Sequence, residues 1–203
     1  MFPLRDENPT ELTPIITFLL VMANVAAWLL LQGAGTADAL MASVCTYGAI
    51  PAEITGRIGA PVPGSLPCPL GGLTWGAILT SMFLHGSWMH IIFNMWFLWI
   101  FGNNIEDSMG HLRFLAFYLL TGLAAAAAHV FSEPASVVPV VGASGAISGI
   151  MGAYLILYPR ARVLIPLVLG FFVRMTWLPA WLMLGYWFAV QALSAAATPA
   201  EAG

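Results

Sequence analysis

Long apolar segments recur along this chain, and they constrain its fold more than any other feature. A membrane-spanning helix needs about 20 mostly apolar residues. Five segments reach or approach that length: 14–33, 87–103, 112–131, 142–158 and 177–195. Of the 203 residues, 60% are hydrophobic and only 7% are charged, against roughly 25% charged residues in soluble domains. The sequence therefore predicts an all-α polytopic membrane protein with a single membrane domain over residues 1–203.

Two details of this prediction concern segment boundaries. The first helix is expected to begin with Thr13 as its cap and Pro14 in its first turn. The apolar stretch VLIPLVLGFFV at 163–173 has 11 residues and contains Pro166 and Gly170. Because it is too short to cross a bilayer, we expect an interfacial or re-entrant segment there.

Loop charges predict the orientation, because the cytoplasmic side of a membrane protein carries the excess of Lys and Arg. With five crossings, the N-terminus and the connections at 104–112 and 159–176 share one side. Five of the six basic residues lie there: Arg5, Arg113, Arg160, Arg162 and Arg174. The N-terminus is therefore expected to be cytoplasmic. The absence of lysine with much Ala and Gly suits a GC-rich bacterium, and we expect the protein in a bacterial inner membrane. The net charge of −3 gives no indication of a nucleic-acid partner.

Both cysteines, Cys45 and Cys68, fall in the long 34–86 connection. That connection faces the non-cytoplasmic side, where oxidising conditions permit disulfides. A disulfide between them and two unpaired cysteines at the interface are both open at this point.

Polar residues inside a membrane are costly and often functional. His90 and Asn94 are four residues apart in the second segment, so they share one helical face. His85 precedes Ser87, a good helix cap, and is expected at the mouth of that helix. The alternatives are interhelical hydrogen bonds, worth about 0.6 kcal/mol each, or a metal site, which the histidine spacing disfavours. Asn24 and Gln191 are expected to be packing hydrogen-bond partners.

The fourth segment opens with GASGAISG, in which Ser144 lies among glycines. Gly145 and Gly149 permit close approach of another helix, and Gly142 frees the backbone before the helix. A serine beside the unpaired N–H groups of a helix N-terminus is well placed for nucleophilic attack with stabilisation of the oxyanion. The alternative is that Ser144 is a small packing residue.

The combination of GASG at 142–145 and HGSWMHIIFNMW at 85–96 resembles the rhomboid family of intramembrane serine proteases. Further similar stretches are YGAIPAEITG at 47–56, FGNNIEDSMG at 101–110 and GAYLILYPRARV at 152–163. The resemblance covers about 45–195. It implies a rhomboid-like helical bundle, with five transmembrane helices of an expected six.

The resemblance also implies roles for individual residues. Ser144 would be the nucleophile of an intramembrane serine endopeptidase. The backbone N–H of Ser144 and the side chains of His90 and Asn94 would form the oxyanion hole. Three residues would support the site: His85, Gly142 and Gly145. Catalysis would pass through an acyl-enzyme.

Outside the site, the resemblance implies that Glu106 anchors the cytoplasmic loop after the second helix. The expected substrates are single-pass transmembrane proteins, met within the lipid bilayer. No cofactor, metal or nucleic acid is expected. A transporter or channel is disfavoured, because the carboxylates fall in loops or near helix ends.

The general base of the family is a histidine on a sixth helix, beyond the fifth apolar segment. The histidines present are His85, His90, His111 and His129. Three alternatives follow. The first alternative is that the protein continues past Gly203 into the sixth helix. The second is that it is a shortened relative that binds membrane proteins without cleaving them. The third is that His129 replaces the usual base.

Overall fold

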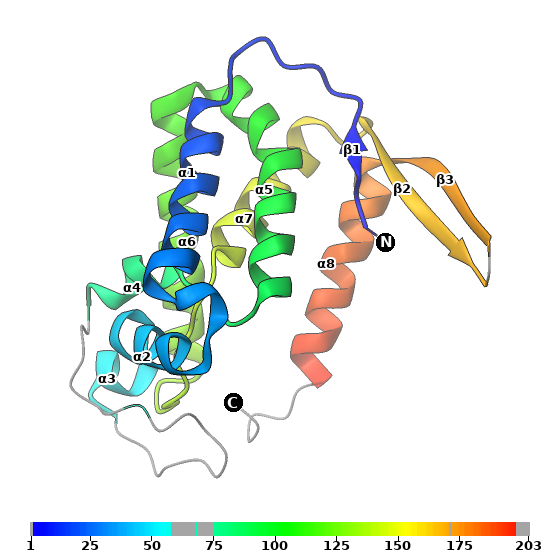
Figure 1. The fold of residues 1–203 in the computed structure, drawn as a ribbon. Helices are drawn as coiled ribbons and strands as arrows, with labels where there is room; N and C mark the ends of the chain where they lie inside the picture. Colours follow the sequence, from blue (N-terminus) through cyan, green and yellow to red (C-terminus); the bar gives the residue numbers. More distant parts are fainter. Residues whose placement is uncertain (1, 58–67, 69–74, 171, 198–203) are drawn as a thin grey trace.

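The computed structural model describes residues 2–57, 68, 75–170 and 172–197, and long helices dominate it (Figure 1). The bundle comprises α1 (Ile15–Ala26), α5 (Trp88–Met109), α6 (His111–Ser132), α7 (Ser144–Leu157) and α8 (Ala180–Ala197). A π-helical turn, Ala27–Leu31, extends α1. Shorter helices precede α5: Gly33–Gly35, α2 (Ala37–Tyr47), α3 (Pro51–Thr55), α4 (Ala77–Thr80) and Ser81–Phe83.

The five long helices of the bundle correspond to the five predicted apolar segments, although α8 begins at Ala180 rather than at residue 177. Within the described ranges, only α6 is both long and apolar enough to cross a membrane. The apolar helices Ile15–Leu31 and Ser144–Leu157 are shorter than that length requires. The five crossings therefore stay a prediction.

Close contact between α6 and α7 depends on two glycines of α7. A Cβ atom on Gly145 would lie 2.5 Å from the Cβ of Ala125, and one on Gly149 would lie 2.5 Å from the Cβ of Thr121. Real Cβ atoms do not approach so closely, so α6 can pack here only because both positions lack side chains. This confirms the close helix approach expected from the sequence.

Glu106, near the end of α5, joins α1 to the turn between α5 and α6. Its buried carboxylate accepts hydrogen bonds from the backbone N–H groups of Ile16 and Thr17, each at 2.8 Å. It also accepts from Thr17 Oγ1 at 2.7 Å and lies 2.5 Å from His111 Nδ1. Pro14 occupies the cap position of α1, and no side-chain cap bond is made from it. The expectation that Thr13 caps this helix is therefore wrong, because the distant carboxylate satisfies its first N–H groups.

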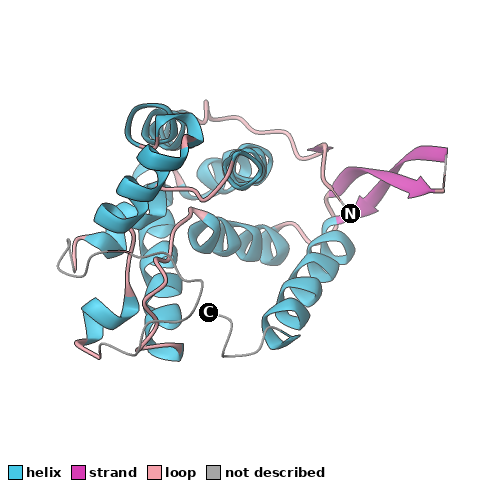
Figure 2. Cartoon of the chain, turned by 60° about the horizontal axis from the view of Figure 1, so that its bottom comes forward, coloured by secondary structure: helices cyan, strands magenta, loops and turns pink. Residues whose placement is uncertain are grey.

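The prediction of an all-α fold is wrong in one region, where a small antiparallel sheet forms. Strand β2 (Arg162–Leu169) pairs with β3 (Phe172–Pro179), and β1 (Arg5–Asp6) pairs with β2. The hairpin covers the apolar stretch that we expected to be interfacial or re-entrant. Pro166 is incompatible with a helix interior, and Gly170 adopts φ +61° at the turn. In Figure 2 the strands lie at one edge of the bundle.

In Figure 1 the N-terminal segment runs from β1 across the top of the bundle to α1, past the end where α5 meets α6; the β2–β3 hairpin starts near this end and extends outward beside α8. Asp107 accepts from the N–H groups of Glu11 and Leu12, and Arg162 pairs with Glu7 at 2.7 Å. Four of the five arginines expected on one side of the membrane belong to segments at or next to this end: Arg5, Arg113, Arg160 and Arg162. Arg174 lies on β3 close to the turn of the hairpin, where it pairs with Leu167.

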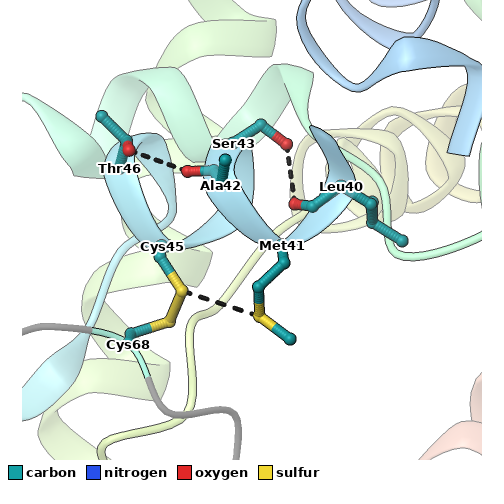
Figure 3. Close-up of a disulfide and its surroundings, with 7 residues drawn as sticks. All are labelled: Leu40, Met41, Ala42, Ser43, Cys45, Thr46 and Cys68. Atoms are coloured by element: carbon teal, nitrogen blue, oxygen red, sulfur yellow. Dashed lines mark hydrogen bonds between the residues drawn. A yellow bond between two sulfur atoms is a disulfide. The ribbon is translucent and has the colours of Figure 1, made fainter. Parts of the chain in front are cut away.

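At the opposite end, a disulfide joins Cys45 on α2 to Cys68 (Figure 3). The sulfur of Cys45 also lies 3.9 Å from that of Met41. Of the two alternatives that the sequence left open, the structure holds the bonded pair. The bond ties α2 to the long connection that leads to α4.

Candidate active site

Ser144 is the first residue of α7, and the backbone that delivers it depends on Gly142. Gly142 adopts φ +126° and donates its N–H to Ser81 O at 2.9 Å. A Cβ atom at this position would lie 2.8 Å from His90 Nε2 and 3.5 Å from Ser144 Oγ. Only glycine meets both conditions, because L-residues rarely adopt this φ and the imidazole fills the space. The His90 ring and the Ser144 hydroxyl therefore flank Gly142.

The start of α7 provides hydrogen-bond donors beside that hydroxyl. No side chain caps this helix, and the first turn bond runs from Ile147 N to Ala143 O at 3.0 Å. The N–H groups ahead of Ile147 therefore have the donor character and positive dipole of a free helix N-terminus.

α5 supplies His90 and Asn94 on the helical face expected from their spacing. Ser87 caps the helix as expected, accepting from His90 N at 3.1 Å. His90 Nδ1 accepts from Gly86 N at 3.4 Å. Because a neutral imidazole carries one proton, this contact assigns the hydrogen to Nε2, the nitrogen that faces Gly142. The side-chain nitrogen of Asn94 is buried, with no hydrogen-bond partner among the described residues.

His85 lies behind His90 and does not line the site. Its side chain is fully buried, and its ring centroid lies 5.0 Å from that of His90 in an edge-to-face arrangement. Burial, with a smaller effect from the neighbouring His90, lowers the pKa of His85 to about 3. The neutral ring therefore packs against His90 and restricts its orientation.

Gln32 holds the His85 backbone from the end of the first helical segment. Its Nε2 donates to His85 O at 2.7 Å, and its Oε1 accepts from His85 N at 2.9 Å. Our reading of the sequence missed this residue, because a glutamine at a helix end carries no local signal of a partner 53 positions away.

The site opens into a cavity of 870 Å³ lined by α5, α7 and α8. Its polar lining comprises His90, Asn94, Ser144, Ser148 and Gln191. Its apolar lining is largely aromatic: Phe2, Phe93, Phe97, Trp187 and Phe188. The cavity therefore brings together the three residues expected at the reaction centre, and it places Gln191 at its wall.

The cavity has no second histidine among the described lining residues. His111 lies at the other end of the bundle beside Glu106. His129 lies in the last turn of α6 and is not part of the cavity wall. The described part of the cavity thus offers a hydroxyl and several hydrogen-bond donors, and its lining contains no imidazole besides that of His90.

Comparisons with known proteins identify the family of this chain. Residues 73–201 match the model of the rhomboid domain. A putative rhomboid protease, YdcA of Bacillus subtilis (strain 168), is 36% identical over 81 residues, which is 40% of each chain. Rhomboid protease GluP of the same organism is 40% identical over 81 residues, 40% of this chain and 15% of the relative.

A plant relative extends the match. Rhomboid-like protein 11, chloroplastic, of Arabidopsis thaliana is 33% identical over 102 residues, 49% of this chain and 36% of the relative. These alignments span at most 40% of the relatives' own length. Because the rhomboid model covers more than half of the chain, including α5, α7 and α8, this protein belongs to the rhomboid family of integral membrane proteins.

Proposed function

We propose that this protein is an intramembrane serine endopeptidase that cleaves transmembrane segments of single-pass membrane proteins, with Ser144 as the nucleophile. The observation that carries the proposal is the convergence of Ser144, His90 and Asn94 on one cavity at the N-terminus of α7. A bulk-exposed serine would meet water rather than a membrane segment. A cavity between helices instead admits a peptide and limits competing solvent.

In the proposed reaction, Ser144 Oγ attacks the scissile carbonyl carbon while its proton passes to a general base. The carbonyl oxygen becomes an oxyanion, which the Ser144 N–H, His90 Nε2–H and Asn94 Nδ2–H stabilise. The leaving amine departs with a proton from the base, and water then hydrolyses the acyl-enzyme. Removing one such donor typically costs about 2.7–4 kcal/mol of transition-state stabilisation.

The unpaired amide nitrogen of Asn94 supports this assignment. A buried polar group without a partner costs roughly 1–3 kcal/mol, so a fold retains it where a ligand supplies the missing bond. His90 supports the assignment too, because its Nδ1 is already an acceptor and its Nε2 is left as a donor. We propose that His85, Gly142 and Gly145 act through position: His85 packs on His90, and the glycines admit the ring and α6.

Three alternatives remain, and they differ in whether the protein has a general base and which residue supplies it. A histidine on a helix that follows α8 would complete a Ser–His dyad. A protein without such a group would bind membrane proteins without cleaving them. This second candidate function is supported by the cavity lining, in which His90 is the only histidine within the described ranges. His129 is the weakest candidate, because it lies outside that lining.

The test uses the full-length protein encoded by its source gene, purified in detergent. A fluorophosphonate probe should label Ser144, and Ser144→Ala should remove both labelling and cleavage of a model transmembrane substrate. Ser148, one turn along α7 in the same cavity, gives the matched comparison: Ser148→Ala should still be labelled. Cleavage by Ser144→Ala at the wild-type rate would refute the proposal, whereas substrate capture without cleavage or labelling would favour the binding protein.

For location, we propose a bacterial inner membrane with a cytoplasmic N-terminus. The support is that β1, the α5–α6 turn and the start of β2, which carry or adjoin four of the six arginines, lie near one end of the bundle (Figure 1). The disulfide at the other end fits an oxidising compartment.

A further inference from the structure

The β2–β3 hairpin has an anchored base and an exposed tip. At the base, Val163 and Ile165 of β2 are fully buried and belong to the hydrophobic core. Beyond the paired residues Ile165 and Thr176, the hairpin extends outward beside α8 (Figure 1). This distal half carries exposed apolar residues that we call the hairpin tip: Leu167, Phe172, Val173 and Met175.

The tip is apolar on both faces of the hairpin. Because successive side chains of a strand point to opposite faces, Val173 and Met175 lie on one face and Phe172 lies on the other. Their exposed fractions are 60%, 57% and 80%. Between positions 166 and 175 the sequence has one polar side chain, that of Arg174. An antiparallel ribbon with one face in water normally keeps that face polar, so this composition indicates apolar surroundings.

The open edge of β3 limits how deep the tip can lie in a bilayer. β2 has β3 on one side and β1 on the other, so the outer edge of β3 has no strand partner within the described ranges. Its outward N–H and C=O groups would be unsatisfied in hydrocarbon, where open sheet edges do not occur. The headgroup region offers water and polar partners, so an interfacial position fits this hairpin better than a re-entrant one.

Basic side chains surround the hairpin. From position 134 to position 200 the sequence contains no carboxylate. Its arginines in that stretch lie beside or on the hairpin, and all are exposed: Arg160, Arg162 and Arg174. Arg5 of β1 adds a fourth positive charge, with its guanidinium carbon 5.5 Å from the ring centroid of Trp177 on β3. Tryptophan is enriched at membrane–water interfaces, so Trp177 is suited to the same depth as the arginines.

Two carboxylates of the N-terminal segment offset part of this charge. Glu7 pairs with Arg162 at 2.7 Å, and Asp6 accepts a hydrogen bond from the Tyr154 hydroxyl. Four arginines against these two carboxylates leave an excess of two positive charges around the hairpin. That excess complements a negatively charged surface.

We infer that the hairpin tip lies in the membrane–water interface and that the arginines around it bind anionic phospholipid headgroups. A lipid surface is the occupant that matches both observations, an apolar tip and an excess of positive charge beside it. The adjoining start of α8 fits the same surface, because Trp181 is 54% exposed there. The inference goes beyond the proposed cleavage reaction, since the tip lies outside the described lining of the Ser144 cavity.

Quenching by brominated lipids tests the position of the tip. Cys45 and Cys68 are bonded to each other, so Val173→Cys adds a single reactive thiol for an environment-sensitive fluorophore. The labelled full chain is placed in nanodiscs of phosphatidylglycerol and phosphatidylcholine that carry bromine on the acyl chains. Emission should be strongly quenched. The same fluorophore on Glu11→Cys, an exposed position of the N-terminal segment, should remain unquenched.

The headgroup preference tests the role of the arginines. Titrating brominated phosphatidylglycerol against brominated phosphatidylcholine gives the ratio of their association constants at the tip. This ratio should exceed one and should fall about fivefold in Arg174→Gln, the factor expected per basic residue near an anionic surface. Arg57→Gln is the matched control, because Arg57 is an exposed arginine that follows α3, away from the hairpin. It should leave the ratio unchanged.

Three results would overturn the inference. Emission at position 173 that resembles position 11 would place the tip in water. Blue-shifted emission without quenching would mean that a second copy of the chain or another protein covers the tip. A ratio that Arg174→Gln leaves unchanged, with unchanged thermal unfolding, would remove the headgroup site. None of these results depends on the phosphonate labelling of Ser144, which tests the protease separately.

Discussion

Replacing Gly142 with alanine tests the geometry of the candidate site most directly. The added methyl group would destabilise the protein in two ways, through backbone strain and through steric overlap with His90. The backbone at φ +126° is a conformation that residues with a Cβ rarely adopt, which costs about 1–3 kcal/mol. The new Cβ would also lie 2.8 Å from His90 Nε2, and overpacking of this kind costs about 1–3 kcal/mol. We expect Gly142→Ala to lower the free energy of unfolding by about 2–6 kcal/mol.

Two other glycines separate these costs. Gly110 has φ +77° with nothing within 4 Å of an added Cβ, so Gly110→Ala should show only the backbone cost, about 1–3 kcal/mol. Gly152 lies inside α7 with nothing within 4 Å, so Gly152→Ala should be neutral or stabilising by up to about 1 kcal/mol.

The assay is reversible unfolding in mixed micelles, combined with the rate of fluorophosphonate labelling at Ser144. Gly142→Ala should also slow labelling, because the displaced imidazole no longer stabilises the developing oxyanion. Gly110→Ala should leave labelling of the folded protein unchanged. If Gly142→Ala destabilised the protein no more than Gly110→Ala and labelled normally, the close approach of His90 to Gly142 would be refuted.

Four further predictions follow from named contacts. Glu106→Gln should destabilise the protein by about 3 kcal/mol in the same assay, because a buried carboxamide cannot accept every bond that the carboxylate accepts from α1; an unchanged midpoint would contradict this. Replacing Cys45 and Cys68 by serine should cost up to about 3 kcal/mol, and alkylation with and without reductant should show two thiols only after reduction. Asn94→Ala should lower kcat on the order of 10²–10³-fold with little change in KM; an equal rise in KM would indicate a binding role instead. The pKa of His85 is about 3 in the folded state against 6.5 in the unfolded chain, so between these pH values only the unfolded chain binds the proton. The free energy of unfolding should therefore fall as pH drops from 6.5 towards 3, by roughly 1 kcal/mol per pH unit. His85→Gln should flatten that slope.

Local sequence information predicted the five long helices and several features of the candidate site, but not the short helices within the 34–86 connection. The spacing of His90 and Asn94 determined their common face, since helical periodicity operates within one turn. Ser87 was identifiable as a cap for the same reason, and Gly145 and Gly149 were identifiable as a contact surface. Ser144 was found through its position at a glycine-rich helix start and through the resemblance carried by its neighbours.

Features that depend on distant partners were missed. Gln32 looks like an ordinary helix-end residue, and only the folded chain places it against the backbone of His85. Gln191 was expected to pack between helices, yet it lines the cavity. The hairpin was missed because a short apolar run fits a strand or an interfacial segment equally well, and strand pairing is itself a long-range property.

The sequence by itself determined that this protein is membrane-embedded, where its five long helices lie and which serine opens the glycine-rich helix. Composition and periodicity are local quantities, readable within one or two turns of chain. Only the tertiary structure decided that Glu106 accepts the first N–H groups of α1, that Gly142 lies between His90 and Ser144, and that Phe2 packs against aromatic side chains of α5 in the lining of the same cavity. Each of these joins residues about 50 to 95 positions apart, and the free energy of such contacts exists only once the helices have packed.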